Sequence, residues 1–406
     1  MWDVRAITDD EVELFRHRLS RGFGSDVSEA DADPTRFKEV FDIDRTFAAF
    51  DDGDIVGTGG AFSFGLTVRG GRTVAMGGTT IITVQPTHRR RGVLRAMMEY
   101  HLDEVASRGE PLAGLWAAEG AIYGRFGFGI ASMRFNMTMD AAAIEFRDET
   151  SLEGVRLLDA EAAEPIMRTL YERVRLTRPG MLTRSDADWR HGVMWDPEHR
   201  RNGRSARRYA VVFEGGEPTG YTTYRQKEKW DEFPEGEVAV IEVMPTTDAS
   251  HTALWHFLTN IDLYPKVEWW NAPVDEPLPA KVTDPRQVRR RLEDALWLRV
   301  LDVPAALHGR TYERDGGLTI GVVDPFRPQV AGAYRLDVSG GEAACERTDR
   351  SPDVEFDVDV LGAIYLGGGE LPALAAAGRV RGSQDARDEL HRIFAADPAP
   401  WCEEVF

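Results

Sequence analysis

The residues best suited to chemistry form a basic loop with a single glycine, Arg89-Arg90-Arg91-Gly92. An apolar run ends before this loop at Val84, and after it apolar side chains recur every three or four residues, which predicts a helix. Backbone N–H groups at such a strand-loop-helix junction bind anions with the help of the helix dipole, and arginines add charge-assisted donors. The segment therefore predicts a diphosphate site, and the alternative is a solvated basic loop. A P-loop is excluded because no Gly-Lys-Ser/Thr follows.

The elements around this loop predict a mixed α/β unit. Alternating or continuous apolar runs favour strands, and three-to-four-residue spacing favours helices. Strands are expected over residues 45–50, 55–64, 79–84, 112–118 and 130–139, and helices over 94–105 and 121–126. The unit is expected to end near residue 140.

A similar order of elements recurs between residues 155 and 290, which indicates an internal repeat. Val84-Gln85-Pro86-Thr87 matches Val243-Met244-Pro245-Thr246, and each is followed by a polar loop and an apolar-faced helix. The second copy has Asp248-Ala249-Ser250-His251 in place of the arginines, so its loop is predicted to have lost the anion site. Prolines between residues 273 and 285 mark a linker, and residues 295–406 indicate a third, α+β unit.

Composition limits the classes of function. The chain has 406 residues, 42% of them apolar, which suits two to four globular domains. Its net charge of −19 disfavours nucleic acid and anionic membranes as partners and favours a cationic one. The N-terminus does not resemble a secretion signal, and Cys345 and Cys402 suit neither a disulfide framework nor a zinc site. We expect a cytoplasmic protein without a bound metal.

Three segments carry a resemblance to a known family. The basic loop resembles the acyl-coenzyme A motif of GNAT acetyltransferases, Arg/Gln-x-x-Gly-x-Gly/Ala, with Leu94 as a departure at the last position. The stretches at 88–98, 119–129 and 399–406 are similar to the Eis (enhanced intracellular survival) acetyltransferases, and the order of units matches over essentially the whole chain. The resemblance implies α/β and α+β architecture: an active GNAT domain (1–145), a degenerate GNAT domain (146–292) and a sterol-carrier-protein-like domain (293–406), assembled as a homohexamer.

The resemblance also implies acetyl-coenzyme A as cosubstrate. Its pantetheine arm would lie between the strand ending at Val84 and the strand 112–118, with the diphosphate in the basic loop. The expected cofactor-binding residues are Ile82, Val84, Arg89, Arg90, Arg91, Gly92, Val93, Leu94, Arg95 and Glu119. Family members often carry a serine where this chain has Ala118, so the chain departs from the family pattern there and has no side-chain hydroxyl to offer the cofactor.

Two residues are expected to be catalytic. Tyr123 stands where GNAT enzymes place a tyrosine near the thioester sulfur, and a phenol of pKa about 10 can protonate a departing thiolate of pKa about 8.5. From spacing alone, Tyr123 could equally be a half-buried aromatic. The terminal carboxylate of Phe406 is expected to enter the active site and help accept the amine's proton. Chain ends usually fray, but the last residues here include apolar Trp401, Cys402 and Val405.

The resemblance implies aminoglycoside acceptors, with protein lysines and polyamines as chemically equivalent alternatives. An acidic stretch would attract such polycations, although it could equally be solvated surface; its members are Asp26, Glu29, Asp31, Asp33, Glu39, Asp42, Asp44, Asp51 and Asp52. The third domain alone would also suit a non-enzymatic lipid-binding or assembly protein. A stable oligomer is expected from the resemblance and from bulky aromatics in mid-chain, namely Trp255, Trp269, Trp270 and Trp297.

Overall fold

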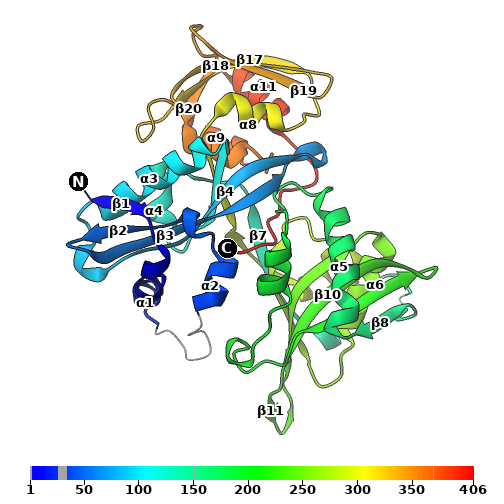
Figure 1. Cartoon of the computed structure of the whole chain (residues 1–406). Helices are drawn as coiled ribbons and strands as arrows, with labels where there is room; N and C mark the ends of the chain where they lie inside the picture. Colours follow the sequence, from blue (N-terminus) through cyan, green and yellow to red (C-terminus); the bar gives the residue numbers. More distant parts are fainter. Residues whose placement is uncertain (1, 26–33, 150, 369) are drawn as a thin grey trace.

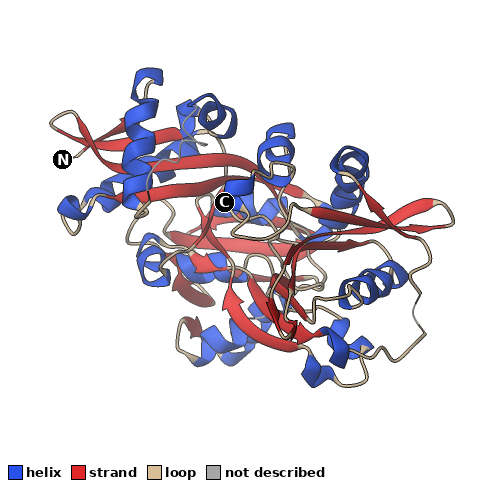
Figure 2. Cartoon of the chain, turned by 90° about the horizontal axis from the view of Figure 1, so that it is seen from below, coloured by secondary structure: helices blue, strands red, loops and turns tan. Residues whose placement is uncertain are grey.

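The computed structural model of the chain describes residues 2–25, 34–149, 151–368 and 370–406. These residues form two seven-stranded sheets and one five-stranded sheet, with an additional small hairpin. Figure 1 shows one body for each large sheet, with the third-domain sheet above and the other two side by side below it. Figure 2 shows helices flanking the strands of these sheets, so each body is a layered α/β or α+β unit.

The first sheet contains the predicted meander. Its strand order is β1 (Asp3–Ala6), β2 (Thr46–Asp51), β3 (Asp54–Thr67), β4 (Thr73–Val84), β5 (Leu112–Trp116), β16 (Leu296–Val300) and β6 (Gly129–Ile130). Its helices are α1 (Val12–Gly22), α2 (Pro34–Val40), α3 (Val93–Ser107) and α4 (Gly120–Tyr123), with 3-10 turns η1 (Asp9–Glu11), η3 (Ile43–Arg45), η4 (Arg69–Gly71), η5 (Pro86–His88) and η6 (Gly124–Phe126). The predicted strand-loop-helix around the basic segment is confirmed as β4, its loop and α3.

The middle of this sheet opens into a V. β4 and β5 run parallel and pair only from Met76↔Leu112 to Gly78↔Gly114. Beyond Gly78, β4 continues to Val84 without a partner on the β5 side. Ile81 has a φ of 49°, a conformation that costs energy for a β-branched residue, and it lies beside a register shift between β3 and β4. This irregularity accompanies the separation of β4 from β5.

The second sheet repeats the same plan. Its order is β15 (Arg289–Asp294), β7 (Met133–Asp140), β14 (Lys266–Pro273), β13 (Glu237–Pro245), β10 (Glu217–Lys227), β9 (Arg208–Glu214) and β8 (Val155–Leu158). The accompanying elements are η7 (Ala141–Ala143), α5 (Ala160–Arg175), the π-helix η8 (Asp188–Val193), η9 (Glu198–Arg200), the hairpin β11 (Trp230–Asp231) and β12 (Phe233–Pro234), α6 (Asp248–Thr259), α7 (Leu278–Lys281) and η10 (Pro285–Gln287). The internal repeat is therefore present as a second sheet with α6 in the place of α3.

The two sheets exchange strands, and this differs from the expected boundaries at 145 and 292. β7 precedes residue 145 but pairs with β14 and β15 in the second sheet. β16 follows residue 292 but lies between β5 and β6 in the first sheet. A local apolar pattern identifies a strand but not its distant pairing partner, which explains the difference.

The third sheet has the order β19 (Glu342–Thr348), β18 (Gly332–Ser339), β17 (Gly316–Val323), β20 (Val354–Asp357) and β21 (Val380–Gly382). Its helices are α8 (Val303–Gly309), α9 (Val358–Ile364), α10 (Leu371–Ala376) and α11 (Gln384–Phe394). One buried cluster contains Met76 and Leu298 of the first sheet together with Leu318 and Phe356 of the third, so these two units share a core.

Three of the four tryptophans that the sequence suggested as interface surface are buried. Trp255, Trp269 and Trp297 are 0%, 1% and 9% exposed and fill cores, whereas Trp270 is 41% exposed. An indole in a core removes a large apolar area from water, and this explains their burial. The expectation of a hexamer consequently depends on the family resemblance alone.

Candidate active site

A pocket of about 650 Å³ lies at the open end of the V between β4 and β5. The last residues of β4, the basic loop and the start of α3 form one side, and the segment after β5 forms the other. Nine expected cofactor residues line it: Ile82, Val84, Arg89, Arg90, Gly92, Val93, Leu94, Arg95 and Glu119. The expected catalytic Tyr123 also lines it.

The start of α3 is built to receive an anion. Gly92 is its N-cap with a φ of 86°, and no side chain caps the helix there. The left-handed conformation favours glycine, and the first N–H groups of a helix have no partner within the helix. Val93 and Met97 are buried against Phe47 and Val56 of β2 and β3, which fixes the helix on the sheet. The chain thus presents uncapped N–H groups and the positive end of the dipole to the pocket.

Arg91 is the exception among the expected cofactor residues, because it does not line the pocket. Its guanidinium lies 5.1 Å from the Trp2 ring centre and 4.0 Å from the Asp51 carboxylate. Trp2 Nε1 donates a hydrogen bond of 3.0 Å to the Arg91 carbonyl. His88 Nε2 also contacts Asp51 at 3.0 Å. Arg91 therefore stabilises the loop through contacts outside the pocket, because its side chain lies beside Trp2 and Asp51.

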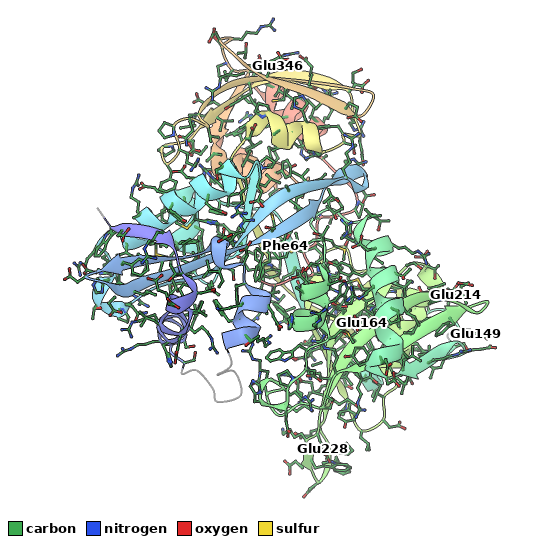
Figure 3. All side chains as sticks on the ribbon, viewed as in Figure 1. Phe64, Glu149, Glu164, Glu214, Glu228 and Glu346 are labelled. Atoms are coloured by element: carbon green, nitrogen blue, oxygen red, sulfur yellow. The ribbon has the colours of Figure 1, made fainter. Side chains whose placement is uncertain are left out.

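At the corresponding helix start in the second domain, side chains of the protein itself occupy the place of an anion. Thr247 caps α6 by accepting a 3.0 Å hydrogen bond from the Ser250 backbone N–H. The carboxylate of Glu214, labelled in Figure 3, accepts hydrogen bonds from Thr247 Oγ1 at 2.6 Å and Thr219 Oγ1 at 2.7 Å. These bonds lower the pKa of Glu214, so it is ionised at neutral pH. A negative charge here repels a diphosphate, which gives the predicted loss of the second site a physical basis.

Tyr123 ends α4 on the far side of the pocket. It is 9% exposed, and its ring lies 6.1 Å from that of Phe128 in an edge contact. Burial, and to a smaller extent the charge of Glu119, raises the pKa of the Tyr123 phenol. The group is therefore protonated at neutral pH and can donate a proton.

The chain terminus reaches the closed end of the same V. The Phe406 ring lies 4.9 Å from that of Phe64, and an added Cβ at Gly78 would stand 3.1 Å from Phe406 Cε2. Trp116 at the end of β5 donates a 2.8 Å hydrogen bond to the Glu404 carbonyl. A Cβ at Gly77 would face Val105 of α3, so Gly78, the next residue along the strand, faces away from α3. The terminus thus meets β4 and β5 where they separate, on the face opposite α3, and Phe406 does not line the pocket described above.

The acidic stretch is only partly described. Asp26, Glu29, Asp31 and Asp33 lie outside the described residues. Of the others, Asp42 caps η3 by accepting from the Asp44 N–H, and Asp51 contacts His88 near the cofactor loop. Glu39 lies 3.4 Å from His191 of the second domain. Three of the described carboxylates, those of Asp42, Asp51 and Glu39, therefore have structural partners, and the attraction of a polycation by this stretch stays a prediction.

Sequence reasoning missed several residues of the pocket wall. Gly22 and Phe23 come from the end of α1, about sixty residues before β4 ends, and no local motif marks them. Arg125 follows Tyr123 in the glycine-flanked turn, so its position there could have been noticed. Within the described residues, no three His, Cys, Asp or Glu side chains are close enough to hold a metal ion. No described helix is both long and apolar enough to cross a membrane.

Comparison with known proteins agrees with this organisation. Residues 3–131 and 180–300 each match a model of an acetyltransferase (GNAT) domain, and residues 303–403 match that of a sterol carrier protein domain. An uncharacterized N-acetyltransferase of Streptomyces avermitilis is 40% identical over 408 residues, covering 100% of this chain and 99% of that protein. N-acetyltransferase Eis of Mycobacterium tuberculosis is 34% identical over 356 residues, covering 85% of this chain and 84% of that protein.

Solved structures give the same result. The crystal structure of Eis1 from Mycobacterium abscessus superposes with a TM-score of 0.87 at 30% identity, with both chains covered fully. A GCN5-related N-acetyltransferase from Anabaena variabilis also has a TM-score of 0.87, at 19% identity, and supports the fold alone. With tandem GNAT domains, a sterol-carrier-protein-like domain and full-length relatives of this kind, the chain belongs to the Eis family of GNAT N-acetyltransferases.

Proposed function

We propose that the chain transfers an acetyl group from acetyl-coenzyme A to amines of small polycationic acceptors, with aminoglycosides as the acceptor class. GNAT acetyltransferases use acetyl-coenzyme A, so family membership already accounts for the cosubstrate. The acceptor class is what the proposal adds. The observation that carries the proposal is the pocket at the β4–β5 opening, which joins an uncapped helix start to a buried tyrosine.

The residues that line the pocket support the proposed placement of the cosubstrate along its length. The N–H groups at the start of α3 and the Arg89 and Arg90 side chains would hold the diphosphate. The backbone of Ile82 and Val84 lies beyond the last β4–β5 pair and would bond the amides of the pantetheine arm. In this placement the thioester would lie toward Tyr123, which lines the opposite wall of the pocket.

Tyr123 and Phe406 would handle the two protons of the reaction. The acceptor nitrogen forms a bond to the acetyl carbon, and the bond from that carbon to sulfur breaks. Tyr123 would give its proton to the departing sulfur, consistent with a phenol whose pKa burial has raised. The Phe406 carboxylate would orient the amine and receive its proton. A free α-carboxylate has a pKa of about 3.3 to 3.7, so this role needs a desolvated site that raises it.

The charge of the chain supports a polycationic acceptor. A net charge of −19 raises the local concentration of multiply charged amines and speeds their encounter. The family resemblance favours aminoglycosides among such amines. We also propose that the chain acts in the cytoplasm as a homohexamer, for which the family resemblance is the support.

The experiment is a thiol-release assay with acetyl-coenzyme A against aminoglycosides, polyamines and lysine peptides, followed by mass spectrometry of the products. We expect the highest kcat/KM for aminoglycosides, with a mass increase for each acetylated amine. A preference for lysine peptides with little aminoglycoside turnover would overturn the acceptor class while leaving the acetyltransferase assignment intact.

A further inference from the structure

A buried arginine of the second domain binds the chain terminus. The Arg184 side chain is 1% exposed and contacts three carboxylates. Its Nη2 lies 2.5 Å from Glu242 Oε1 of β13 and 3.1 Å from Glu403 Oε2, and its Nε donates to Glu404. Glu404 is two residues before Phe406. One guanidinium thus connects a central strand of the degenerate domain to the last residues of the chain.

Arg184 is also attached to the active domain through its own backbone segment. The Thr67 N–H donates to the Met181 carbonyl at 2.8 Å, and the Thr183 N–H donates to the Gly65 carbonyl at 2.9 Å. Thr183 Oγ1 accepts a 2.8 Å bond from the Gly65 N–H. These bonds pair residues 181–183 with the end of β3, close to Phe64. Phe64 is the residue on which the Phe406 ring packs. Arg184 is therefore fixed in register with the strand that receives the terminus.

The guanidinium has little freedom to move. It lies 3.8 Å from the centre of the Tyr171 ring and 4.9 Å from that of Trp189. Tyr221 donates a 2.7 Å hydrogen bond that holds Glu242 on the other side. A planar guanidinium stacked in this way loses little further entropy when it binds a carboxylate. The cluster is a preorganised receptor for Glu403 and Glu404.

Other contacts hold the tail close to this receptor but end before Phe406. Asn271 Nδ2 donates to the carbonyls of Cys402 and Glu403 at 3.1 Å each. Trp401 is 3% exposed and packs 5.9 Å from Trp269. Burial, with the nearby carboxylate Glu242, raises the pKa of Glu403, which limits the charge that a single guanidinium must balance.

We propose that Arg184 is a positioning residue for acetyl transfer: by holding Glu403 and Glu404 it places the Phe406 carboxylate at the closed end of the V, where β4 and β5 begin to separate. The inference rests on the proposed role of that carboxylate. It also gives the second domain a role in the reaction, although the start of its own helix α6 is capped by Thr247 and cannot offer the same anion site. The Glu242 that binds Arg184 occupies the repeat position of Thr83, a residue of the cofactor pocket in the first domain.

The test uses the full chain with Arg184→Met and with Glu404→Ala. The second variant leaves the guanidinium paired with Glu242 and Glu403, so it keeps the buried charge compensated if the first does not fold. Arg168→Met is the matched control, because Arg168 also lies near the Trp189 ring, at 5.1 Å, and pairs with two acids, Glu164 and Asp186. We expect kcat to fall about tenfold or more in Glu404→Ala and Arg184→Met, with the KM for acetyl-coenzyme A unchanged.

A second readout does not depend on activity. Carboxypeptidase A should release Phe406 at least about tenfold faster from Arg184→Met or Glu404→Ala than from the wild type or Arg168→Met, because a released terminus opens more often. Equal release rates for Glu404→Ala and the control would overturn the proposal.

A double-variant cycle separates this inference from the proposed function. In a chain lacking Phe406, Glu404→Ala should cause no further loss of kcat, because both changes remove the same carboxylate from its place. Additive losses would overturn the positioning role while leaving the Phe406 role intact. Full kcat in the chain lacking Phe406 would instead overturn the proposed role of the carboxylate itself.

Discussion

The left-handed conformation of Gly92 provides a sharp test of the proposed cofactor site. Replacing Gly92 by alanine puts a Cβ at a φ of 86°, which costs about 1 to 2 kcal/mol. The added Cβ would meet only Trp2 Nε1, at 4.0 Å, so the free protein has room for it. The strain therefore falls on the backbone of the loop, which carries the N–H groups that line the pocket.

The expected effect on binding follows from those donors. A hydrogen bond to a charged group contributes about 1.5 to 3 kcal/mol, and a loop that relaxes toward negative φ misdirects at least one of them. We expect the Kd for coenzyme A, measured by calorimetry, to rise about tenfold to a hundredfold in Gly92→Ala.

The chain offers a matched control at the other end of the same helix. Gly109 follows α3 with a φ of 75°, and an added Cβ there would meet nothing within 4 Å. Gly109→Ala should lower the thermal midpoint about as much as Gly92→Ala while leaving coenzyme A affinity unchanged. Equal affinity in Gly92→Ala and the wild type, or an equal loss in both variants, would refute the reasoning.

Further predictions concern charge, pH and assembly. Arg89→Ala should raise the Kd for coenzyme A about tenfold, because this side chain lines the pocket, whereas Arg91→Ala should leave it unchanged; calorimetry compares them. Burial and the charge of Arg45 lower the pKa of His101 from 6.5 to about 3. The unfolded chain therefore binds a proton at this residue below pH 6.5 while the folded chain does not, and the free energy of unfolding should fall by up to about 5 kcal/mol as the pH decreases from 6.5 toward 3. His101→Gln should flatten this part of the unfolding profile measured by urea denaturation at several pH values. Light scattering should give about six times 45.4 kDa, and a monomer mass at micromolar concentration would contradict the hexamer.

The strand-loop-helix unit around the basic loop could be predicted because its signals lie in adjacent residues. A strand ending at Val84, a glycine at position 92 and an apolar helix face are features of adjacent residues, and the structure joins them as predicted. The comparison of the two loops also succeeded, because Thr247 and Ser250 are good capping residues that compete for the same N–H groups.

Features that depend on distant partners could not be read in this way. The sequence alone does not distinguish the three arginines, and it is the contacts with Trp2 and Asp51 that set Arg91 apart from Arg89 and Arg90. Arg184 stands in a loop without a motif, and its carboxylate partners are 58 to 220 residues away along the chain. The family resemblance could suggest a role for the terminus, but not which side chains hold it.

The strand exchange makes the first sheet depend on a strand from the far side of the second domain. β5 pairs with β4 over three residues only, whereas its pairing with β16 extends over five, from Leu296↔Trp116 to Val300↔Leu112. A chain ending at residue 131 lacks β16, so β5 would keep only its short ladder and expose an apolar edge. Tyr123 follows β5 directly and forms the far wall of the pocket. The strand β16, from beyond the second domain, thus supports the segment that carries Tyr123, the proposed general acid. Within the second domain, Arg184 would support the terminus, and this is the task proposed for a domain whose own anion site is lost.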